Sequence, residues 1–387
     1  MKLTKTLALV LVLAMCLTLF AGCGKKAKNY AADNTEFVIG LSGPLTGVAA
    51  IYGQAVNNAA QMAVDEINAA GGLNGIKFKL VAMDDMHDAA KISTNYSAML
   101  EGGMQLSLGT VTTGPGLEFT NLSAEDNVFF LTPSASGDKI PANPNGYQMC
   151  FADGNQGKVA AQFVNENFKG QTIGVFYKSD EPYSKGIYDQ FKDNLDSTVK
   201  TVEASFSDAN TTDFSTQIDT LKDCGFIFMP IYYDPASLFM QQAKNIVAAD
   251  TVYYGCDGFD GIDTAFDINS ITQKVTMLSH FNSKAESGAA KTFIDKYVAR
   301  FGADTLNQFG ASAYDCVYAL YGAMKKAIAS GKDIPVNISP SDLCEILKEQ
   351  FAGGYTYTNG VTGDSISWTA DGFVNKSAIQ YVIKEAT

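Results

Sequence analysis

Three short segments of the chain are rich in groups that donate hydrogen bonds. They read SGPLTGVAAIYG at 42–53, TVTTGPG at 110–116 and TPSAS at 132–136, and each follows an apolar run. Their hydroxyls, and the backbone N–H groups that small residues leave accessible, suit an anion, above all where a helix begins. One such segment alone is more simply explained as a helix N-cap. Three of them, ending neighbouring strands, favour a site that binds a carboxylate.

A fourth segment, YGCDGFDG at 254–261, places Asp257 directly after the apolar run TVYYG. A carboxylate there can pair with an ammonium group, although a turn aspartate beside glycine is also common. Tyr183 and Tyr233 fall at or just past other apolar runs, where they either cover a ligand or are buried structural tyrosines. A zwitterion has both a carboxylate and an ammonium group. It would be bound by donors for the carboxylate, an acid for the ammonium group and aromatic rings between them. The sequence therefore predicts an amino-acid site.

Signatures of catalysis and of nucleotide binding are absent from the sequence. It has no GxxxxGK[ST] phosphate loop, no GxGxxG at the start of a helix and no GxSxG turn. His87, in DDMHD, is the only candidate base near an expected strand end, and we interpret it as a loop residue. The formal charge of −13 disfavours nucleic acid, because an acidic surface repels phosphates. We therefore predict a binding protein with no catalytic residues rather than an enzyme.

The elements that must position these segments alternate between strand and helix. An apolar run at 37–41 precedes a helical pattern at 53–72, the alternating strand IKFKLVAMDD and a further helical stretch at 89–100. The order restarts near Phe151 with TIGVFY and an amphipathic helix. With 387 residues, the chain is long enough for two domains. We predict an α/β fold of two doubly wound parallel-sheet lobes, whose strand ends face a ligand cleft between them.

The N-terminus has the pattern of a secretory signal. Two lysines precede a short apolar core that ends at Gly22-Cys23, too short to span a membrane. We expect residues 1–22 to be the signal peptide and Cys23 to be the lipidated first residue of the mature protein, as in a bacterial lipobox. Phe20 departs from the aliphatic residue that is usual there. Residues 23–35 would then form a polar tether, and an ordinary secretory signal is the alternative.

Cysteine and histidine usage gives no support for a metal site. The chain has seven cysteines and two histidines, with no CxxC spacing. Apart from the signal and the lipobox, the cysteines are Cys150, Cys224, Cys256, Cys316 and Cys344, an odd number whose pairing stays open. We predict neither a metal nor a cofactor.

Taken together, the segments resemble the ABC-transporter substrate-binding proteins of the leucine/isoleucine/valine-binding family. The resemblance rests on IGLSGPLTG with YG, AVDEINAAGGLNG, LGTVTTGPG, FFLTPSAS, the YYDP corner and the YGCDG loop, in this order along nearly the whole mature chain. It implies that an amino acid, branched-chain or otherwise apolar, is captured by hinge closure and delivered to an ABC permease. It also implies an extracytoplasmic monomer, anchored by its lipid to the outer face of the cell membrane.

The resemblance assigns roles to individual residues. Thr113 would bind the ligand carboxylate, the Ser134–Ser136 segment the carboxylate and the ammonium group, and Asp257 the ammonium group. The remaining contacts would be Tyr183 and Tyr233 from the second lobe, and Tyr52, Val111 and Phe309 around the ligand side chain. Within the Ser134–Ser136 segment, Ala135 would contribute its backbone.

The resemblance also implies the lobe boundaries and shows departures. The first lobe would hold 36–153 and 283–378, the second 154–282 and 379–387, joined by three crossovers. A disulfide found in some members is absent, because His87 and Thr112 stand at its positions. Asp257 replaces a frequent glutamate, and Ile231-Tyr232 is bulkier than usual. An amide, urea or aromatic acid as the ligand, or a ligand-sensing lipoprotein, are the alternatives.

Overall fold

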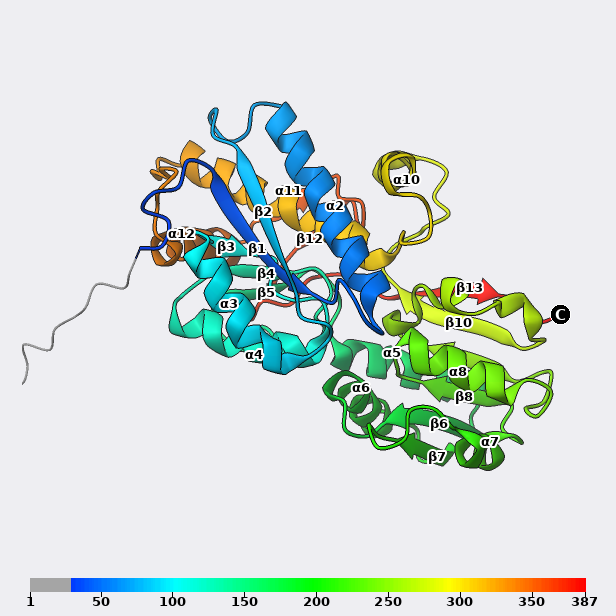
Figure 1. Ribbon diagram of the computed structural model, residues 1–387. Helices are drawn as coiled ribbons and strands as arrows, with labels where there is room; N and C mark the ends of the chain where they lie inside the picture. The colour runs from blue at the N-terminus through cyan, green and yellow to red at the C-terminus, as the bar shows by residue number, and fades with distance from the viewer. Residues whose placement is uncertain (1–28) are drawn as a thin grey trace, which may run out of the picture.

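The computed structural model describes residues 29–387 and has two α/β lobes, each built on its own sheet (Figure 1). The signal peptide and Cys23 lie outside the described residues. The first lobe's sheet has the order β2-β1-β3-β4-β5, and all its neighbouring strands are parallel. These strands are β1 (Phe37–Gly43), β2 (Phe78–Asp84), β3 (Leu106–Ser107), β4 (Phe130–Thr132) and β5 (Gly146–Gln148).

Helices cover both faces of this sheet, as the alternating sequence pattern predicts. The apolar stripes of α2 and α11 form one core with Phe37, Ile39 and Leu41 of β1. On the opposite face, α3 and α4 pack around Met104 and Phe130. The helices of this lobe are α2 (Ala50–Ala69), η1 (Ala89–Lys91), α3 (Ile92–Glu101), α4 (Thr113–Glu125), α10 (Gly288–Phe301), α11 (Gln308–Ala329) and α12 (Pro340–Ala352), and a small hairpin, β11 (Thr356–Thr358) with β12 (Ser365–Ser367), follows α12.

The second lobe's sheet has the order β13-β10-β9-β8-β6-β7. Only β13, the last strand of the chain, runs antiparallel to its neighbour. The strands are β6 (Thr172–Lys178), β7 (Lys200–Phe206), β8 (Phe226–Met229), β9 (Val252–Gly255), β10 (Lys274–Ser279) and β13 (Ile379–Lys384). The helices are α5 (Asp153–Asn167), α6 (Pro182–Asp193), α7 (Ser215–Leu221), α8 (Tyr233–Ala243), η2 (Asp257–Phe259), α9 (Ile262–Ala265) and η3 (Ile268–Ser270).

The chain passes from one lobe to the other after β5, after β10 and again before β13. The last crossing is held to the first lobe by Lys376, whose buried ammonium group lies near the carboxylate of Asp315 and donates to the Thr362 hydroxyl. Burial lowers the pKa of Lys376 to about 8, although the negative charge of Asp315 acts to raise it. This anchoring fixes one end of the hinge.

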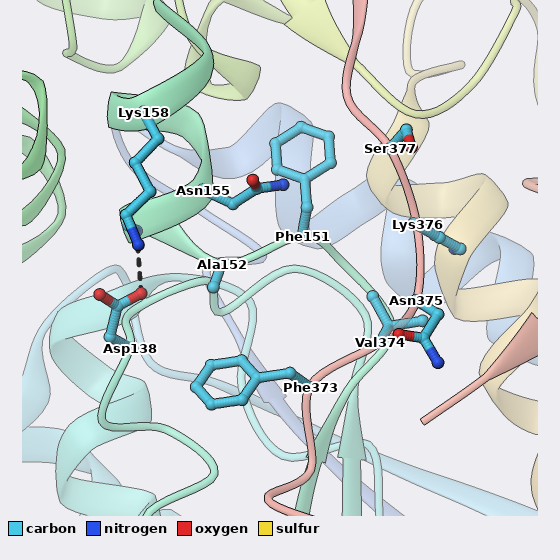
Figure 2. Close-up of a pocket in the computed structure, with 11 residues that line it drawn as sticks. Asp138, Phe151, Ala152, Asn155, Lys158, Phe373, Val374, Asn375, Lys376 and Ser377 are labelled. Carbon is cyan, nitrogen blue, oxygen red and sulfur yellow. Dashed lines mark hydrogen bonds between the residues drawn. The ribbon is translucent and has the colours of Figure 1, made fainter. Parts of the chain in front are cut away.

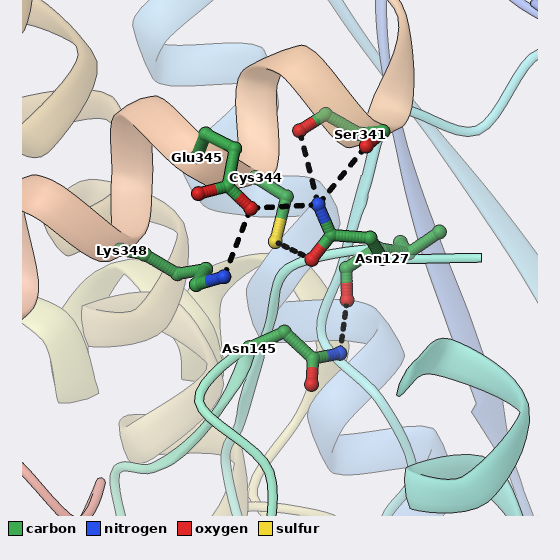
Figure 3. A network of polar contacts seen from close by, with 7 residues as sticks. Asn127, Asn145, Ser341, Cys344, Glu345 and Lys348 are labelled. Atoms are coloured by element: carbon green, nitrogen blue, oxygen red, sulfur yellow. Dashed lines mark hydrogen bonds and ion pairs between the residues drawn. The ribbon is translucent and has the colours of Figure 1, made fainter. Parts of the chain in front are cut away.

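A polar network fixes the entry to β4, the strand that leads into the TPSAS segment (Figure 3). The amide of Asn127 donates to the carbonyl and hydroxyl of Ser341 and to Glu345, all on α12. Asn145 donates to the Ser123 hydroxyl and to the Val128 carbonyl. These bonds tie the connection before β4 to α12 and to the end of α4, and so fix where the strand begins.

The five cysteines whose pairing was left open are free thiols, and each of them is buried. Within residues 29–387, no group of three or more histidine, cysteine, aspartate or glutamate side chains is arranged to hold a metal ion. No helix of that part of the chain has both the length and the apolarity needed to cross a bilayer.

Candidate functional site

The strand ends of the two lobes meet around a small interlobe cavity. The first lobe contributes the start of α2, the loops after β3 and β4 and the start of α11; the second contributes α6, the entry to α8 and η2. The cavity has a volume of about 10 Å³, room for about one water molecule. Its lining consists of Tyr52, Val111, Thr112, Ser134, Ser136, Tyr183, Tyr232, Asp257 and Phe309.

The first lobe presents an uncapped helix N-terminus to this cleft. The first N–H groups of any helix lack partners within it, and Thr112, at the N-cap of α4, makes no side-chain cap hydrogen bond. The hydroxyl of Thr113 is buried and, within the described chain, has no hydrogen-bond partner. Free N–H groups, the positive end of a helix dipole and an unpaired hydroxyl are features that suit an anion such as a carboxylate.

The second lobe presents a buried acid, Asp257, at the start of η2. Its Oδ1 accepts hydrogen bonds from the Tyr183 hydroxyl, at 2.6 Å, and from the Gln156 amide, at 3.0 Å. Gln156 also accepts from the backbone N–H of Asp257. Burial raises the pKa of Asp257 to about 6, although these hydrogen bonds favour the ionised form. At neutral pH the side chain is therefore a desolvated carboxylate that would gain from a cation.

A second buried acid, Asp153, lies in the first turn of α5. Its Oδ1 lies 3.5 Å from the same Gln156 amide, and its Oδ2 has no partner within residues 29–387. Burial, and then the charge of Asp257, raise the pKa of Asp153 well above its ordinary value. Asp153 and Asp257 are therefore coupled acids, and burial favours the neutral form of each.

Aromatic side chains close the cleft from both lobes. The hydroxyl of Tyr52, on α2, donates to the Gly258 carbonyl at 2.5 Å and accepts from the Tyr233 N–H at 3.2 Å. Its ring meets Phe309 edge-on at 4.8 Å and Tyr233 at 5.1 Å. A second direct contact between the lobes joins the Gln308 N–H to Asp260. The lobes are thus closed on one another.

Most residues expected from the sequence line this cavity: Tyr52, Val111, Ser134, Ser136, Tyr183, Asp257 and Phe309. Thr113 instead lines an adjoining interlobe hollow of about 360 Å³, together with Asp153. Ala135 does not line the cavity, because its N–H donates to Thr132 and its carbonyl accepts from Gln148. Tyr233 lies behind Tyr52 rather than on the cavity wall.

Four residues of the site were not among those expected: Thr112, Asp153, Gln156 and Tyr232. Asp153 carried a signal that could have found it, because it follows the apolar run YQMCF at the first turn of a helix. Gln156 carried no such signal in the sequence, since a glutamine within a helix is common. Tyr232 stood beside the expected Tyr233, and only the direction of the chain entering α8 decides which ring faces the cleft.

His87 and Thr112, the two positions at which the resemblance implied a missing disulfide, are joined by a hydrogen bond. The His87 Nδ1 lies 2.9 Å from the Thr112 hydroxyl. His87 has a left-handed backbone, with φ of 64°, and its N–H donates to Asp85. Burial lowers the pKa of His87 to about 4, so the ring is neutral at physiological pH. It is a structural brace for the loop.

A larger cavity, about 660 Å³, lies where the first and last crossings run side by side (Figure 2). Its walls include Phe151 and Ala152 from one crossing, and Phe373, Val374 and Lys376 from the other. None of its lining side chains has a buried polar atom without a partner. Because its walls belong to the hinge, we expect its shape to change with lobe motion, and we do not regard it as the ligand site.

The chain matches one protein-family model and several amino-acid-binding proteins. A family model described as periplasmic binding protein covers residues 36–381. A leucine-, isoleucine-, valine-, threonine- and alanine-binding protein from Pseudomonas aeruginosa is 28% identical over 313 residues, covering 79% of this chain and 81% of the relative. The Leu/Ile/Val-binding protein BraC3 from Rhizobium johnstonii is 27% identical, covering 79% of this chain and 86% of its own.

Solved structures share the fold over most of the chain. The branched-chain amino acid transporter substrate binding protein LivJ from Streptococcus pneumoniae, in complex with isoleucine, aligns with a TM-score of 0.77 at 25% identity, covering 91% of this chain and 99% of LivJ. A leucine binding protein, LivK, from Thermotoga maritima aligns with a TM-score of 0.76 at 20% identity, covering 91% and 96%. The second likeness concerns the fold alone.

Replacement of Tyr52 by phenylalanine tests whether its hydroxyl holds the lobes together. The variant loses the bonds to Gly258 and Tyr233, a loss of about 1–3 kcal/mol for the closed form, so we expect a more open protein. Small-angle scattering should show a larger radius of gyration than in the wild type. Tyr188→Phe is the control, because that hydroxyl bonds Glu203 within the second lobe. Equal radii for all three proteins would contradict the assignment.

Proposed function

Since the chain belongs to the periplasmic binding protein family, we propose that it captures an α-amino acid, branched-chain or otherwise apolar, and delivers it to an ABC permease. The relatives from Pseudomonas aeruginosa and Rhizobium johnstonii and the isoleucine complex of LivJ support this ligand class. Members of this family bind solutes rather than transform them, and capture proceeds by closure of the lobes over the ligand.

The observation that carries the proposal is the opposition of charge across the cleft. Thr112, at the N-cap of α4, and the buried carboxylate of Asp257 line the same cavity from opposite lobes. The unpaired Thr113 hydroxyl, one residue further on, offers a donor in the neighbouring interlobe hollow. An α-amino acid has one group for each. An amide, urea or aromatic acid has no ammonium group, so it would leave Asp257 buried and uncompensated, at a cost of a few kcal/mol.

The individual roles follow from this geometry. Thr113 and Ser136 would hold the carboxylate, and Asp257 the ammonium group. Tyr183 would act through Asp257, which it orients with a 2.6 Å hydrogen bond. Tyr52, Val111 and Phe309 would contact the ligand side chain, with Tyr233 supporting Tyr52. The hydroxyl of Ser134 is already engaged with the Val111 carbonyl at 2.7 Å, so we assign it and Ala135 to shaping the loop.

Thermal melts of residues 24–387, stripped of bound ligand by unfolding and refolding, test the proposal with each of the twenty amino acids. An apolar amino acid at ~100 times its dissociation constant should stabilise the protein by about 2.7 kcal/mol, several degrees in melting temperature. Asp257→Asn and Thr113→Ala should weaken binding and so reduce this shift at the same ligand concentration.

Asp263→Asn and Thr220→Ala, the same changes at exposed positions of the second lobe, should keep the shift. A folded wild-type protein that no amino acid stabilises would refute the proposal and direct attention to amides, urea and organic acids.

Affinity should depend on pH through Asp257. The ligand ammonium group pairs with the ionised carboxylate, and the folded-state pKa is about 6, so binding should weaken below pH 6, by about tenfold at pH 5. The ligand-free protein should behave in the opposite way. Because the folded pKa is raised above the ordinary value, the contribution of Asp257 to stability increases as pH falls from about 6 towards 4.

Titration calorimetry between pH 5 and 8 measures the binding effect, and Asp257→Asn should remove most of the dependence. Asp260 and Glu181, whose pKa values burial raises to about 7, titrate in the same range. An unchanged pH profile in Asp257→Asn would assign the dependence to those groups instead.

We also propose that the protein acts outside the cytoplasm as a lipid-anchored monomer, with Cys23 as the lipidated residue. The support is the sequence of the N-terminus, since residues 1–28 lie outside the described structure. Mass spectrometry of the full chain expressed in a bacterium should find a diacylglyceryl group on Cys23, and Cys23→Ala should release the protein from the membrane fraction. Membrane association of Cys23→Ala equal to the wild type would contradict the anchor.

A further inference from the structure

The ring of Tyr232 lies between the two lobes at the centre of the cleft. It stacks on Tyr183 of its own lobe, with centroids 4.4 Å apart and planes 9° from parallel. It meets two rings of the first lobe, His87 edge-on at 5.2 Å and Tyr52 at 5.8 Å. Tyr232 also lines the cavity that contains Asp257. It is therefore a wall of the proposed ligand site and a contact between the lobes.

The neighbours of Tyr232 are held in place and cannot easily yield. Tyr183 is fixed by the hydrogen bond that it donates to Asp257 and by one that it accepts from the Gly258 N–H, at 2.9 Å. The backbone of Gly258 itself fits closely, because a Cβ there would lie 2.7 Å from the Tyr183 hydroxyl and 3.1 Å from the Tyr232 ring. On the other lobe, His87 is braced by Thr112 and by Asp85.

The space left beside these rings is small. In the closed arrangement the cavity is about 10 Å³, and the rest of its lining consists of the apolar residues Val111 and Phe309 and the polar residues Thr112, Ser134 and Ser136. A ligand must enlarge it by moving the lobes apart or by displacing side chains. The hydrogen bonds of Tyr52 to Gly258 and of Gln308 to Asp260 require close approach of the lobes. Each additional carbon of the ligand side chain separates the lobes further and so weakens these bonds.

From this geometry we infer that Tyr232 sets the ligand size: among apolar α-amino acids, the protein selects those with short side chains, the size of alanine, over leucine, isoleucine and phenylalanine. The inference rests on the proposed function, and it narrows the substrate class of the same site. The aromatic ring, rather than any charged group, carries the selection, because it fills the volume that a longer side chain needs.

The test compares the affinities of alanine, serine, valine, leucine and phenylalanine for residues 24–387. The wild type should bind alanine at least about tenfold more tightly than leucine, the scale on which a pocket discriminates by one or more carbons. Tyr232→Ala should tighten leucine relative to alanine by about tenfold or more. The backbone of Tyr232 is extended, and its side chain makes no cap hydrogen bond, so alanine fits without strain.

Two matched variants complete the experiment. Tyr232→Phe keeps the ring and should keep the wild-type order, and Tyr188→Ala, the same truncation outside the cleft, should do so as well. If Tyr232→Ala does not fold, the wild-type ranking decides alone. Leucine bound as tightly as alanine by the wild type, or an unchanged ratio in Tyr232→Ala, overturns the inference while leaving the proposed function intact. If no amino acid binds any of these proteins, both fail.

Discussion

The burial of Asp257 is the constraint on which the arrangement of the cleft depends. A carboxylate removed from water is costly unless hydrogen bonds and a positive charge compensate it. Tyr183 and Gln156 supply the hydrogen bonds, and they come from the starts of two helices, α6 and α5. The protein supplies no cation in contact with Asp257 among the described residues. Under the proposed function the ligand supplies the positive charge, which would tie closure of the lobes to binding.

The same constraint explains why the helix N-terminus and the buried acid lie on different lobes. A helix N-terminus with free N–H groups and a buried acid would neutralise each other if one loop carried both. The helix N-terminus belongs to α4 of the first lobe and the acid to η2 of the second. They are therefore separated whenever the lobes are apart. Outside the cleft, Lys376 ties the last crossing to the first lobe, and Asn127 ties the segment before β4 to α12 within that lobe.

The contrast between Tyr233 and Tyr232 shows that the sequence alone did not predict which of two adjacent rings faces the cleft. Both follow the buried strand β8, and the sequence favoured Tyr233 as the contact. In the structure Tyr233 supports Tyr52, while Tyr232 stacks on Tyr183 and faces the first lobe. Asp153 is a similar case, because its importance comes from a partner, Asp257, that is distant in the chain. Such residues are recognised only when the elements that carry them have been placed.

Local patterns in the chain are enough to predict the α/β architecture, the two sets of strands and helices, and the loops that face the cleft. These follow from local rules: the period of apolar residues, glycine and proline at element ends, and hydroxyls before helices. Local patterns do not predict which side chains meet across the cleft, that Asp257 and Asp153 share one buried environment, or how much room Tyr232 leaves. The physical reason is that these properties depend on distances between segments remote in the chain, which closure of two separately folded lobes sets.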